Sequence, residues 1–597
     1  MIMRLADYMA DFLVKHGITH QFTVTGGGAM FLNDAFGHKE GLKCIYNHHE
    51  QACSVAAEGY ARASGKICSV CVTTGPGGTN ALTGVMGAYV DSIPMFVISG
   101  QVKFSTTVAS CPDIPLRQLG DQEFPIISCA RQMTKYAVMV TDPLTIRYHM
   151  KKALFLATHG RPGPVWLDVP INVQSAKIDT DALIDYDESE DRDQIAPQPR
   201  EEEISSLLAK LASAKRPVIL AGDGIRISDT VEAFRALAHK LRVPVCTAWN
   251  SHDLLGDDDP VSCGRPSTVG TRGGNFVLQT ADFVLALGCR MNIRQIGYNW
   301  EKFAEHAYLA SVDIDAAELD KPTLHVDRKI RADLRDFLPA MLKGAYAPAH
   351  EAWLAWAKEV AFRYPAADPA YYQKSEPVNP YVFMKEMSEQ FAADETVVTS
   401  NGSACVCGFQ AMRIREGQRI FTNSGSASMG YGLPAAIGAA VAKGTRVVCI
   451  EGDGSIQMNL QELQTVVTNG LPLKIVWLNN QGYHSIRQTQ TNSFRANFCG
   501  VGENDGISFP EAERIAYAYR LPFYRVTRNE DVAETVRAWL SSEGPAVLEA
   551  VLDKTQFFAP KLSSKQLPDG TIVSPSLEDM YPFLKETEKP ILPKDLQ

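Results

Sequence analysis

Two short polar motifs, each directly after a buried apolar run, constrain the fold of the C-terminal third of this chain. Gly452-Asp453-Gly454-Ser455 follows the apolar run 447–450, and Asn479-Asn480 follows the apolar run 473–478. Between the motifs, residues 458–468 have helical spacing, and Gly470 suits a helix C-cap. This strand–helix–strand order predicts two parallel strands that carry Asp453 and Asn480 at their carboxyl ends, where open α/β sheets bind ligands.

The residue types at this edge predict a cation and a diphosphate. Asp453, Asn480 and the main-chain carbonyl of Gly482 offer the hard oxygen ligands that Mg²⁺ prefers, with phosphate oxygens completing the shell. Main-chain N–H groups at Gly452, Gly454 and Ser455 would approach a diphosphate at a helix start. A lone Gly-Asp-Gly is usually only a turn, so the spacing to the asparagine pair carries the prediction.

That spacing resembles the signature of thiamine-diphosphate enzymes, and a second segment supports the resemblance. Residues 47–52 (Asn-His-His-Glu-Gln-Ala), followed by residues 57–62, resemble the segment that carries the activating glutamate of the acetolactate synthase-like family, which includes pyruvate oxidases and decarboxylases. Glycine clusters at 25–29, 75–80 and 100–102 fall at family-like positions. The resemblance covers residues 4–555 and implies thiamine diphosphate and Mg²⁺ as cofactors.

The resemblance also implies roles for single residues. Glu50 matches the glutamate beside the aminopyrimidine ring, where a poorly solvated carboxyl group shares a proton with the cofactor. Met429 matches the apolar wedge under the two rings, and the carbonyl of Ala427, where the family usually has glycine, matches the acceptor for the amino group. The plain alternatives are an exposed helix-start glutamate and a core methionine. The other expected cofactor-binding residues are Gly27, Gly28, Pro76, Asn80, Ser403, Gly452, Asp453, Gly454, Ser455, Asn480, Gly482 and Tyr483.

Compositional shifts divide the chain into three α/β domains, each predicted to be a doubly wound parallel sheet. Residues 1–175 form the expected pyrimidine-binding domain, residues 200–342 a middle, FAD-binding domain, and residues 378–555 the domain for the diphosphate and Mg²⁺. An acidic stretch over 179–193 is expected to be a solvated linker. The tail, residues 556–597, is expected to form a strap over the site or a subunit edge.

The middle domain raises the question of a flavin. Acetolactate synthases carry a largely non-redox FAD between their first two domains, and the resemblance implies the same here. Relatives with an empty middle domain keep similar glycine turns, so an empty domain is the alternative. The residues near flavin-holding positions are Arg161, Gly222, Gly224, Gly270, Gly273, Gly288, Arg290, Arg294, Asp313 and Asp333.

Two departures from the family bear on the substrate. Gln122 falls on the glutamine of the family's substrate-side loop, but Asp121 replaces its phenylalanine, and Arg487 falls where acetolactate synthases have a tryptophan. An arginine pairs bidentately with a carboxylate or phosphate, and a tryptophan does not; a surface arginine is the alternative. These departures favour transfer of the two-carbon unit of pyruvate to another carbonyl, such as a nucleotide-linked keto sugar of branched-sugar biosynthesis, over branched-chain amino-acid synthesis.

Three classes of function remain open at this level. The first is a decarboxylating carboligase, which takes a short 2-oxo acid donor and a carbonyl acceptor and makes acetohydroxy acids or 2-hydroxy ketones. The second is a flavin-dependent pyruvate oxidase, and the third is a non-catalytic binding subunit. The presence of Glu50, Asp453 and Asn480 disfavours the third. The family's architecture implies a homodimer or homotetramer in which the Glu50 domain of one subunit meets the Asp453 domain of another.

Composition excludes other classes. The 597 residues carry a net charge of −10 with no basic run, which argues against a nucleic-acid partner. No apolar run approaches a membrane span, and the start, residues 5–13, is an acidic amphipathic helix rather than a signal peptide. The 13 scattered cysteines suggest no disulfide framework and suit a reducing cytoplasm.

Overall fold

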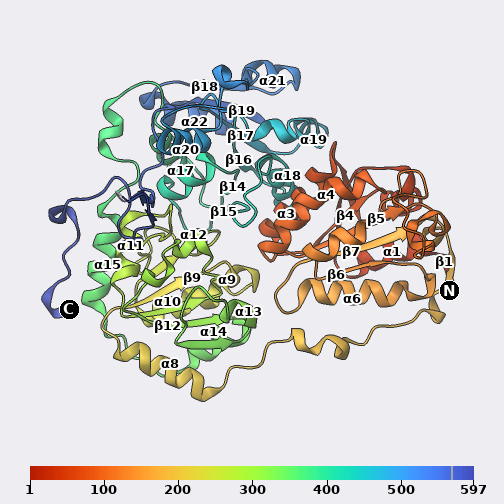
Figure 1. Ribbon diagram of the computed structural model, residues 1–597, viewed down its shortest axis with the longest axis horizontal. Coiled ribbons are helices and arrows are strands. Elements are labelled where there is room, and N and C mark those ends of the chain that lie inside the picture. Colours follow the sequence, from red (N-terminus) through yellow and green to blue (C-terminus); the bar gives the residue numbers. More distant parts are fainter. Residues whose placement is uncertain (567–568) are drawn as a thin grey trace.

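Three separate parallel β-sheets, each with helices on both faces, form the core of the computed structural model, which describes residues 1–566 and 569–597. The predicted α/β class with three doubly wound domains is confirmed (Figure 1). The central strands are continuous apolar runs because helices cover both of their faces; all five residues of β4, for example, are buried.

The first sheet has the strand order β3-β2-β4-β5-β7-β6. Its strands are β2 (His20–Thr23), β3 (Lys43–Tyr46), β4 (Cys68–Val72), β5 (Met95–Gln101), β6 (Tyr136–Met139) and β7 (Pro164–Pro170). The helices are α1 (Leu5–Lys15), α2 (Met30–Gly37), α3 (Glu50–Ser64), α4 (Pro76–Val90), α5 (Ile126–Ala130), α6 (Ile146–Thr158) and α7 (Ile171–Gln174). A short antiparallel pair, β1 (Ile2–Arg4) and β8 (Lys177–Asp179), closes this unit.

The middle sheet has the order β10-β9-β11-β12-β13. Its strands are β9 (Pro217–Ala221), β10 (Val245–Thr247), β11 (Phe283–Leu287), β12 (Tyr308–Asp313) and β13 (Arg328–Arg331). The helices are α8 (Glu201–Ser213), α9 (Gly224–Ile227), α10 (Val231–Leu241), α11 (Arg272–Thr280), α12 (Ile293–Ile296), α13 (Ala316–Leu319), α14 (Leu334–Lys343) and α15 (Glu351–Arg363). The strand that follows β9 in the chain, β10, lies on one side of it, and the next strand, β11, lies on the other. The carboxyl ends of β9 and β11 therefore form a topological switch point.

The third sheet has the order β15-β14-β16-β17-β19-β18. Its strands are β14 (Thr396–Thr399), β15 (Arg419–Phe421), β16 (Val447–Gly452), β17 (Leu473–Asn479), β18 (Phe523–Val526) and β19 (Ala546–Val551). The helices are α16 (Pro380–Ser388), α17 (Ser403–Ala411), α18 (Gly432–Lys443), α19 (Glu462–Thr468), α20 (His484–Phe494), α21 (Ala512–Ala518) and α22 (Val532–Ser541). Strands β16 and β17 are parallel neighbours, with Gly452 opposite Leu478. The helix expected between them is shorter than its pattern, because a 3₁₀ turn over Ile456–Asn459 precedes α19.

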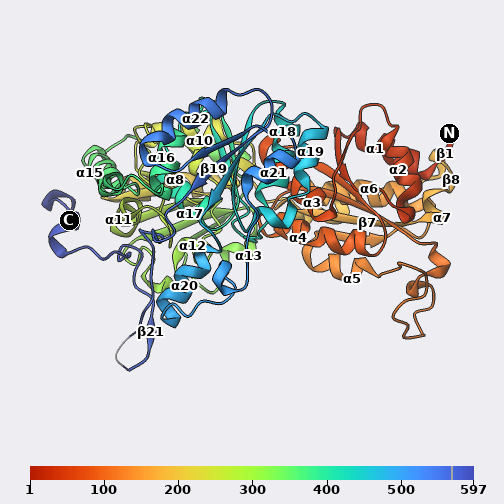
Figure 2. The same ribbon diagram turned by 90° about the horizontal axis from the view of Figure 1, so that it is seen from above.

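The first domain packs on the third through two helices that cross with their backbones in contact. A Cβ on Gly59 of α3 would lie 2.6 Å from the Cα of Ala435, and one on Gly438 of α18 would lie 2.8 Å from the amide nitrogen of Tyr60. Figure 2 shows α3, α18 and α19 together at the junction of the two lobes. Since both crossing positions are glycine, the two helices approach more closely than side chains would allow.

Two extended segments connect the domains. The residues between β8 and α8 run along the outside of the molecule from the first domain to the middle one (Figure 1). The C-terminal tail, which includes the short pair β20 (Lys565–Gln566) and β21 (Ile572–Val573), leaves the third domain and lies on the middle one. Gln410 of α17 donates to the carbonyl of Pro560, and Arg272 of α11 donates to that of Pro582, both at 2.7 Å. The tail therefore straps the third domain to the middle domain. Nowhere in the described residues is there a helix long and apolar enough to cross a membrane.

Candidate active site

The first group of predicted residues gathers around Glu50, the first residue of α3. Asn80 donates its side-chain amide to Oε2 of Glu50 at 2.9 Å, and a Cβ on Gly77 would lie 3.8 Å from Oε1. The turn before α4 also meets Gln122, because a Cβ on Gly75 would collide with the Gln122 carbonyl oxygen. The structure thus brings Glu50, Asn80, Gln122 and the turn at Pro76 together. The Glu50 side chain is half-buried rather than enclosed.

The loop that carries Gln122 is held by its neighbour. Buried Glu123 accepts hydrogen bonds from the backbone N–H groups of Val108 and Leu119 at 3.1 and 3.2 Å. Gln122 itself has φ of +63°, a left-handed conformation that costs a non-glycine residue energy. On the other side of the turn, Gly28 donates its N–H to Oγ1 of Thr73 at 3.1 Å, and the neighbouring Gly27 has open space where a Cβ would stand.

The second group lies at the carboxyl ends of β16 and β17, as the motifs predict. Oδ2 of Asp453 accepts the backbone N–H groups of Asn480 and Gly482, each at 3.1 Å. The Asn480 amide nitrogen donates to Oγ of Ser403 at 3.4 Å, while its Oδ1 is buried with no partner in the described part of the chain. Burial raises the pKa of Asp453 to about 7. A buried carboxylate beside an unpartnered amide oxygen fits a hard divalent cation, which would supply the missing charge and bond.

Two glycines, Gly482 after β17 and Gly454 after β16, stand where no side chain would fit. A Cβ on Gly482, which has φ of +141°, would collide with the carbonyl oxygen of Val501. A Cβ on Gly454 would lie 2.8 Å from a ring carbon of Tyr483. No cluster of three or more His, Cys, Asp or Glu side chains able to hold a metal occurs among residues 1–566 and 569–597. The fit at Asp453 therefore depends on amide and main-chain oxygens.

The segment expected to carry the wedge is tied to the same site. Ala427 has φ of +54°, which explains why glycine would suit this position, and Met429 is half-buried two residues later. The carbonyl of Ser428 accepts the Asn401 side-chain amide at 2.7 Å, and Gly430 donates its N–H to Oγ of Ser455 at 2.9 Å. The loop around Asn401 thus holds the wedge segment in place.

Arg487 lies against the loop that follows β17. Its guanidinium donates to the carbonyl of Asn480 at 3.0 Å and to that of Gln481 at 2.7 Å. Burial lowers the pKa of Arg487, and the carboxylate of Asp453 opposes that shift. Arg487 therefore fastens the loop after β17, on whose geometry the Asp453 site depends.

A separate cleft of about 1140 Å³ lies between the first and middle domains, at the switch point of the middle sheet. Seven of the ten residues expected near a flavin line it: Arg161, Gly222, Gly224, Gly288, Arg290, Asp313 and Asp333. Gly270, Gly273 and Arg294 do not. Gly273 packs on α15, where a Cβ would lie 2.6 Å from the Ala361 carbonyl oxygen, and Arg294 stacks on Trp249 with 5.1 Å from its guanidinium carbon to the ring centroid.

The cleft has features that suit a dinucleotide. A Cβ on Gly222 would lie 2.6 Å from the backbone nitrogen of Cys289, so the loops after β9 and β11 are in close contact. At such a switch point, glycines without side chains let the backbone approach a pyrophosphate. Asp313 ends β12, where an acidic residue can bind a ribose hydroxyl, and burial raises its pKa to about 6. Arg161 reaches across from the first domain and pairs with Glu318 at 2.7 Å.

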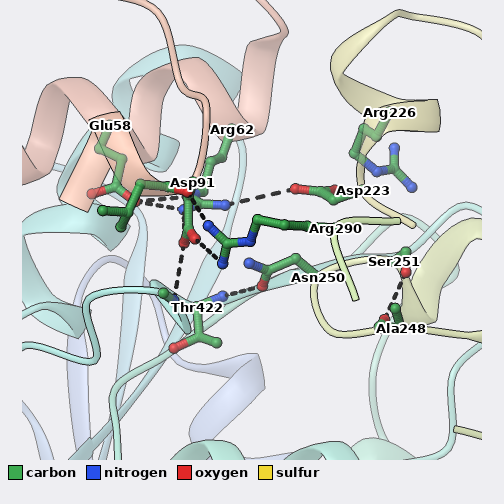
Figure 3. Close-up of polar contacts among 12 residues, drawn as sticks. Glu58, Arg62, Asp91, Asp223, Arg226, Ala248, Asn250, Ser251, Arg290 and Thr422 are labelled. Carbon is green, nitrogen blue, oxygen red and sulfur yellow. Dashed lines mark hydrogen bonds and ion pairs between the residues drawn. The ribbon is translucent and has the colours of Figure 1, made fainter. Parts of the chain in front are cut away.

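A buried ion network joins the cleft to the two thiamine-type domains (Figure 3). Arg62 of α3 pairs with Glu58 and Asp91 at 2.7 Å each, and lies 3.8 Å from Asp223 of the cleft. Asp91 also meets Arg290 at 3.5 Å. Burial raises the pKa of Glu58 to about 7. From the sequence, we expect Arg290 near a flavin in the middle domain, but the network is not predicted. The one indication in the sequence is that Glu58 and Arg62 stand four residues apart in a mostly apolar helix.

Two further buried carboxylates escaped prediction from the sequence. Glu451, in β16 just before the Gly-Asp-Gly motif, accepts the backbone N–H of Leu433 at 3.0 Å, and burial raises its pKa to about 7. Glu462, the first residue of α19, accepts hydrogen bonds from the segment that precedes Glu50. An acid on the apolar face of a short helix was the only signal for Glu462.

Fold and site together are those expected of a thiamine-diphosphate-dependent enzyme, and comparisons with known proteins agree. The chain matches three family models: "Thiamine pyrophosphate enzyme, N-terminal TPP binding domain" over 3–122, the "central domain" over 204–341 and the "C-terminal TPP binding domain" over 400–550. It is 32% identical to the acetolactate synthase isozyme 2 large subunit of Escherichia coli (strain K12), over 97% of this chain and 100% of that protein.

Other relatives are similar over comparable lengths. The chain is 30% identical to acetolactate synthase 2, chloroplastic, of Nicotiana tabacum, over 94% of this chain and 83% of that protein. It is also 30% identical to the acetolactate synthase large subunit of Lactococcus lactis, over 92% of each. The chain therefore belongs to the acetolactate synthase-like branch of the thiamine pyrophosphate enzyme family.

Proposed function

We propose that this protein binds thiamine diphosphate with Mg²⁺, decarboxylates pyruvate or a related short 2-oxo acid, and joins the two-carbon unit to an acceptor carbonyl. The observation that carries the proposal is the buried carboxylate of Asp453, which accepts the backbone N–H of Asn480, together with the unpartnered Oδ1 of that asparagine, in a domain on which the Glu50 segment is docked. The products would be acetohydroxy acids or 2-hydroxy ketones.

The chain's own residues have definable tasks in this reaction. When bound, thiamine diphosphate would supply a nucleophilic carbon for the 2-oxo carbonyl and an electron sink for the loss of CO₂. Glu50 would hold the proton at the aminopyrimidine nitrogen, and the Ala427 carbonyl would accept the neighbouring amino group. Met429 would support the rings, while Asp453, Asn480 and Gly482 would hold Mg²⁺ and thereby the diphosphate.

A Glu50→Gln variant tests the assignment. The amide cannot exchange the proton that Glu50 holds, so CO₂ release from pyruvate at saturating cofactor should fall steeply while cofactor affinity stays near the wild-type value. The matched control is Glu50→Asp, which keeps an exchangeable carboxyl group and should retain part of the turnover. Wild-type CO₂ release in Glu50→Gln would overturn the proposal.

For the acceptor, we propose a carbonyl compound other than the 2-oxo acids of branched-chain amino-acid synthesis, with a nucleotide-linked keto sugar as the sharper candidate. Asp121 supports this, since it replaces an expected phenylalanine of the substrate-side loop; Arg487 supports it only by removing the expected tryptophan, because its guanidinium is bound to the carbonyls of Asn480 and Gln481. Mass spectrometry of products formed from pyruvate with a panel of 2-oxo acids, aldehydes and nucleotide-linked keto sugars tests it. Exclusive formation of acetolactate would contradict it.

We also propose that the cleft between the first and middle domains binds FAD, because its switch-point loops and Asp313 suit a dinucleotide. The absorption spectrum of the purified protein tests binding. Reduction of the bound flavin by pyruvate within a single turnover would instead favour a pyruvate oxidase. A purified protein that neither retains FAD nor gains thermal stability with it would contradict binding.

Finally, we propose a homodimer or homotetramer in a reducing compartment, the cytoplasm. The free state of all 13 cysteines supports the compartment. The single chain already packs its first domain on its third, so the assembly, with sites shared between subunits, is proposed on family resemblance. Light scattering tests it, and a monomeric mass with full activity would refute it.

A further inference from the structure

We infer that Glu462 is a positioning residue that fixes Glu50 from the third domain. The inference deepens the proposed function and depends on it. It starts from three hydrogen bonds to one buried carboxylate. Oε2 of Glu462 accepts the Asn47 side-chain amide at 2.9 Å and the Thr465 hydroxyl at 2.7 Å, and Oε1 accepts the His48 backbone N–H at 3.0 Å.

Two of these donors lie immediately before Glu50. Asn47 and His48 form the short connection between β3 and α3, and Glu50 is the first helical residue after it. The direction in which a helix starts depends on the residues before its first turn. A carboxylate that binds both a side chain and a backbone N–H of this connection therefore sets where the Glu50 side chain stands.

The contact is enclosed. Glu462 is fully buried and Asn47 is 7% exposed, and no cationic side chain pairs with Glu462 in the described ranges. A buried carboxylate without a cation must be satisfied by hydrogen bonds, and here three donors and the start of α19 do so. Cys53, one turn into α3, has its pKa raised well above the ordinary value by burial and by the charges of Glu462 and Glu50, which places both carboxylates near this turn.

The location of Glu462 gives the contact its consequence. Helix α19 follows the Gly-Asp-Gly motif in the chain, and Asn459 just before it donates to the Gly430 carbonyl of the wedge segment at 2.7 Å. The same short stretch thus touches the wedge on one side and the Glu50 segment on the other. Within one chain, Glu462 thereby ties the start of α3, and with it Glu50, to the stretch that also holds the wedge segment.

Replacing Glu462 with alanine is the direct test. Asn47 and His48 lose their acceptor, and a displacement of about 1 Å at a reacting group can cost about 100-fold in rate. We expect kcat for CO₂ release to fall about 10- to 100-fold, with little change in KM for pyruvate or in thiamine diphosphate affinity. A kcat within about 2-fold of the wild-type value would overturn the inference.

The conservative variant separates position from charge. In Glu462→Gln the amide oxygen can still accept from His48, and the amide nitrogen can donate to Oδ1 of Asn47, which is buried and unpartnered. We expect this variant to recover most of the kcat that Glu462→Ala loses. Equal losses in both would refute a positioning role and indicate that the charge itself matters.

A matched control and a cofactor-free measurement exclude a general loss of structure. Leu463→Ala removes the next, fully buried side chain of α19 and should lower stability but not kcat. In the apo protein, hydrogen exchange at peptides covering residues 44–53 should accelerate in Glu462→Ala and not in Leu463→Ala. Unchanged exchange, or an equal kcat loss in Leu463→Ala, would overturn the inference. Loss of CO₂ release in Glu50→Gln with none in Glu462→Ala would refute the inference while leaving the proposed function intact.

Discussion

Gly438→Ala should separate the first and third domains, because the crossing of α3 and α18 leaves no space for a methyl group. The new Cβ would lie against the carbonyl oxygen of Ala56 and 2.8 Å from the amide nitrogen of Tyr60, whereas real Cβ atoms stay at least 3.0 Å from such neighbours. Both obstructing atoms belong to the backbone of α3. They cannot rotate away, so the helices themselves must part.

The magnitude follows from two opposing effects. Overpacking against rigid neighbours costs about 3 kcal/mol, at the upper end of the usual range. The gain in helix propensity from glycine to alanine returns about 1 kcal/mol. We therefore expect a net loss of about 2 kcal/mol in the free energy of unfolding, together with lower turnover because α3 carries Glu50.

The assay is urea unfolding followed by a probe of the interface between the two domains, with CO₂ release measured in parallel. Gly408→Ala in α17 is the control, since its Cβ would lie close only to the terminal methyl of Met412, at 3.0 Å, with the sulfur of Met384 and the methyl of Thr399 at an ordinary 3.9 Å. These flexible side chains can move, so the control should be neutral or slightly stabilised. Equal unfolding midpoints for Gly438→Ala and the wild type would refute the reasoning.

Three further outcomes can be measured. Asp453→Ala should weaken thiamine diphosphate binding and abolish its Mg²⁺ dependence together. Since the pKa of Asp453 is raised to about 7, the Mg²⁺ affinity of the wild type should rise with pH to about 7 and level off above it. Cofactor titrations of the variant that match those of the wild type, both with and without EDTA, would contradict this. The pKa of Glu451 is raised to about 7 in the folded protein, so as pH rises Glu451 loses its proton first in the unfolded chain, and the free energy of unfolding of the apo protein falls between about pH 4.5 and about pH 7. Glu451→Gln should reduce this dependence of the unfolding free energy on pH, measured by urea unfolding. The same pH dependence in variant and wild type would contradict the prediction. Mixed oligomers of Glu50→Gln and Asp453→Ala subunits should regain turnover if subunits share sites, and verified hybrids without activity would exclude sharing.

The sequence predicts those parts of the molecule that depend on local patterns. The apolar runs before Asp453 and Asn480 are strands, and their carboxyl ends meet because the strands are parallel neighbours. Glycine at 482 is explained by a positive φ and by the nearby Val501 carbonyl, as a turn motif would suggest. Periodicity and turn chemistry act within a few residues, so they survive in any fold that uses those elements.

Contacts between distant residues lie beyond such patterns. Nothing near Asn47 indicates that its amide binds Glu462, and nothing near Arg62 indicates Asp223 in another domain. The family resemblance places Gly273 near a flavin, but its lack of a side chain serves the packing of α11 on α15. A glycine can satisfy either need, and only the tertiary structure distinguishes them.

Helix α3 is held at three points, each by a different part of the molecule. Its start is fixed by Glu462, its middle by the crossing with α18, and its end by the network from Arg62 to Asp91 and Asp223. Because the middle contact is backbone against backbone, α3 and α18 must move as one body. A ligand in the cleft could displace Arg290 from Asp91. It would therefore act on the docking of the first domain on the third before it altered the position of Glu50 in the first domain. Such an arrangement suits a cofactor in the cleft that stabilises the assembled site without taking part in its chemistry.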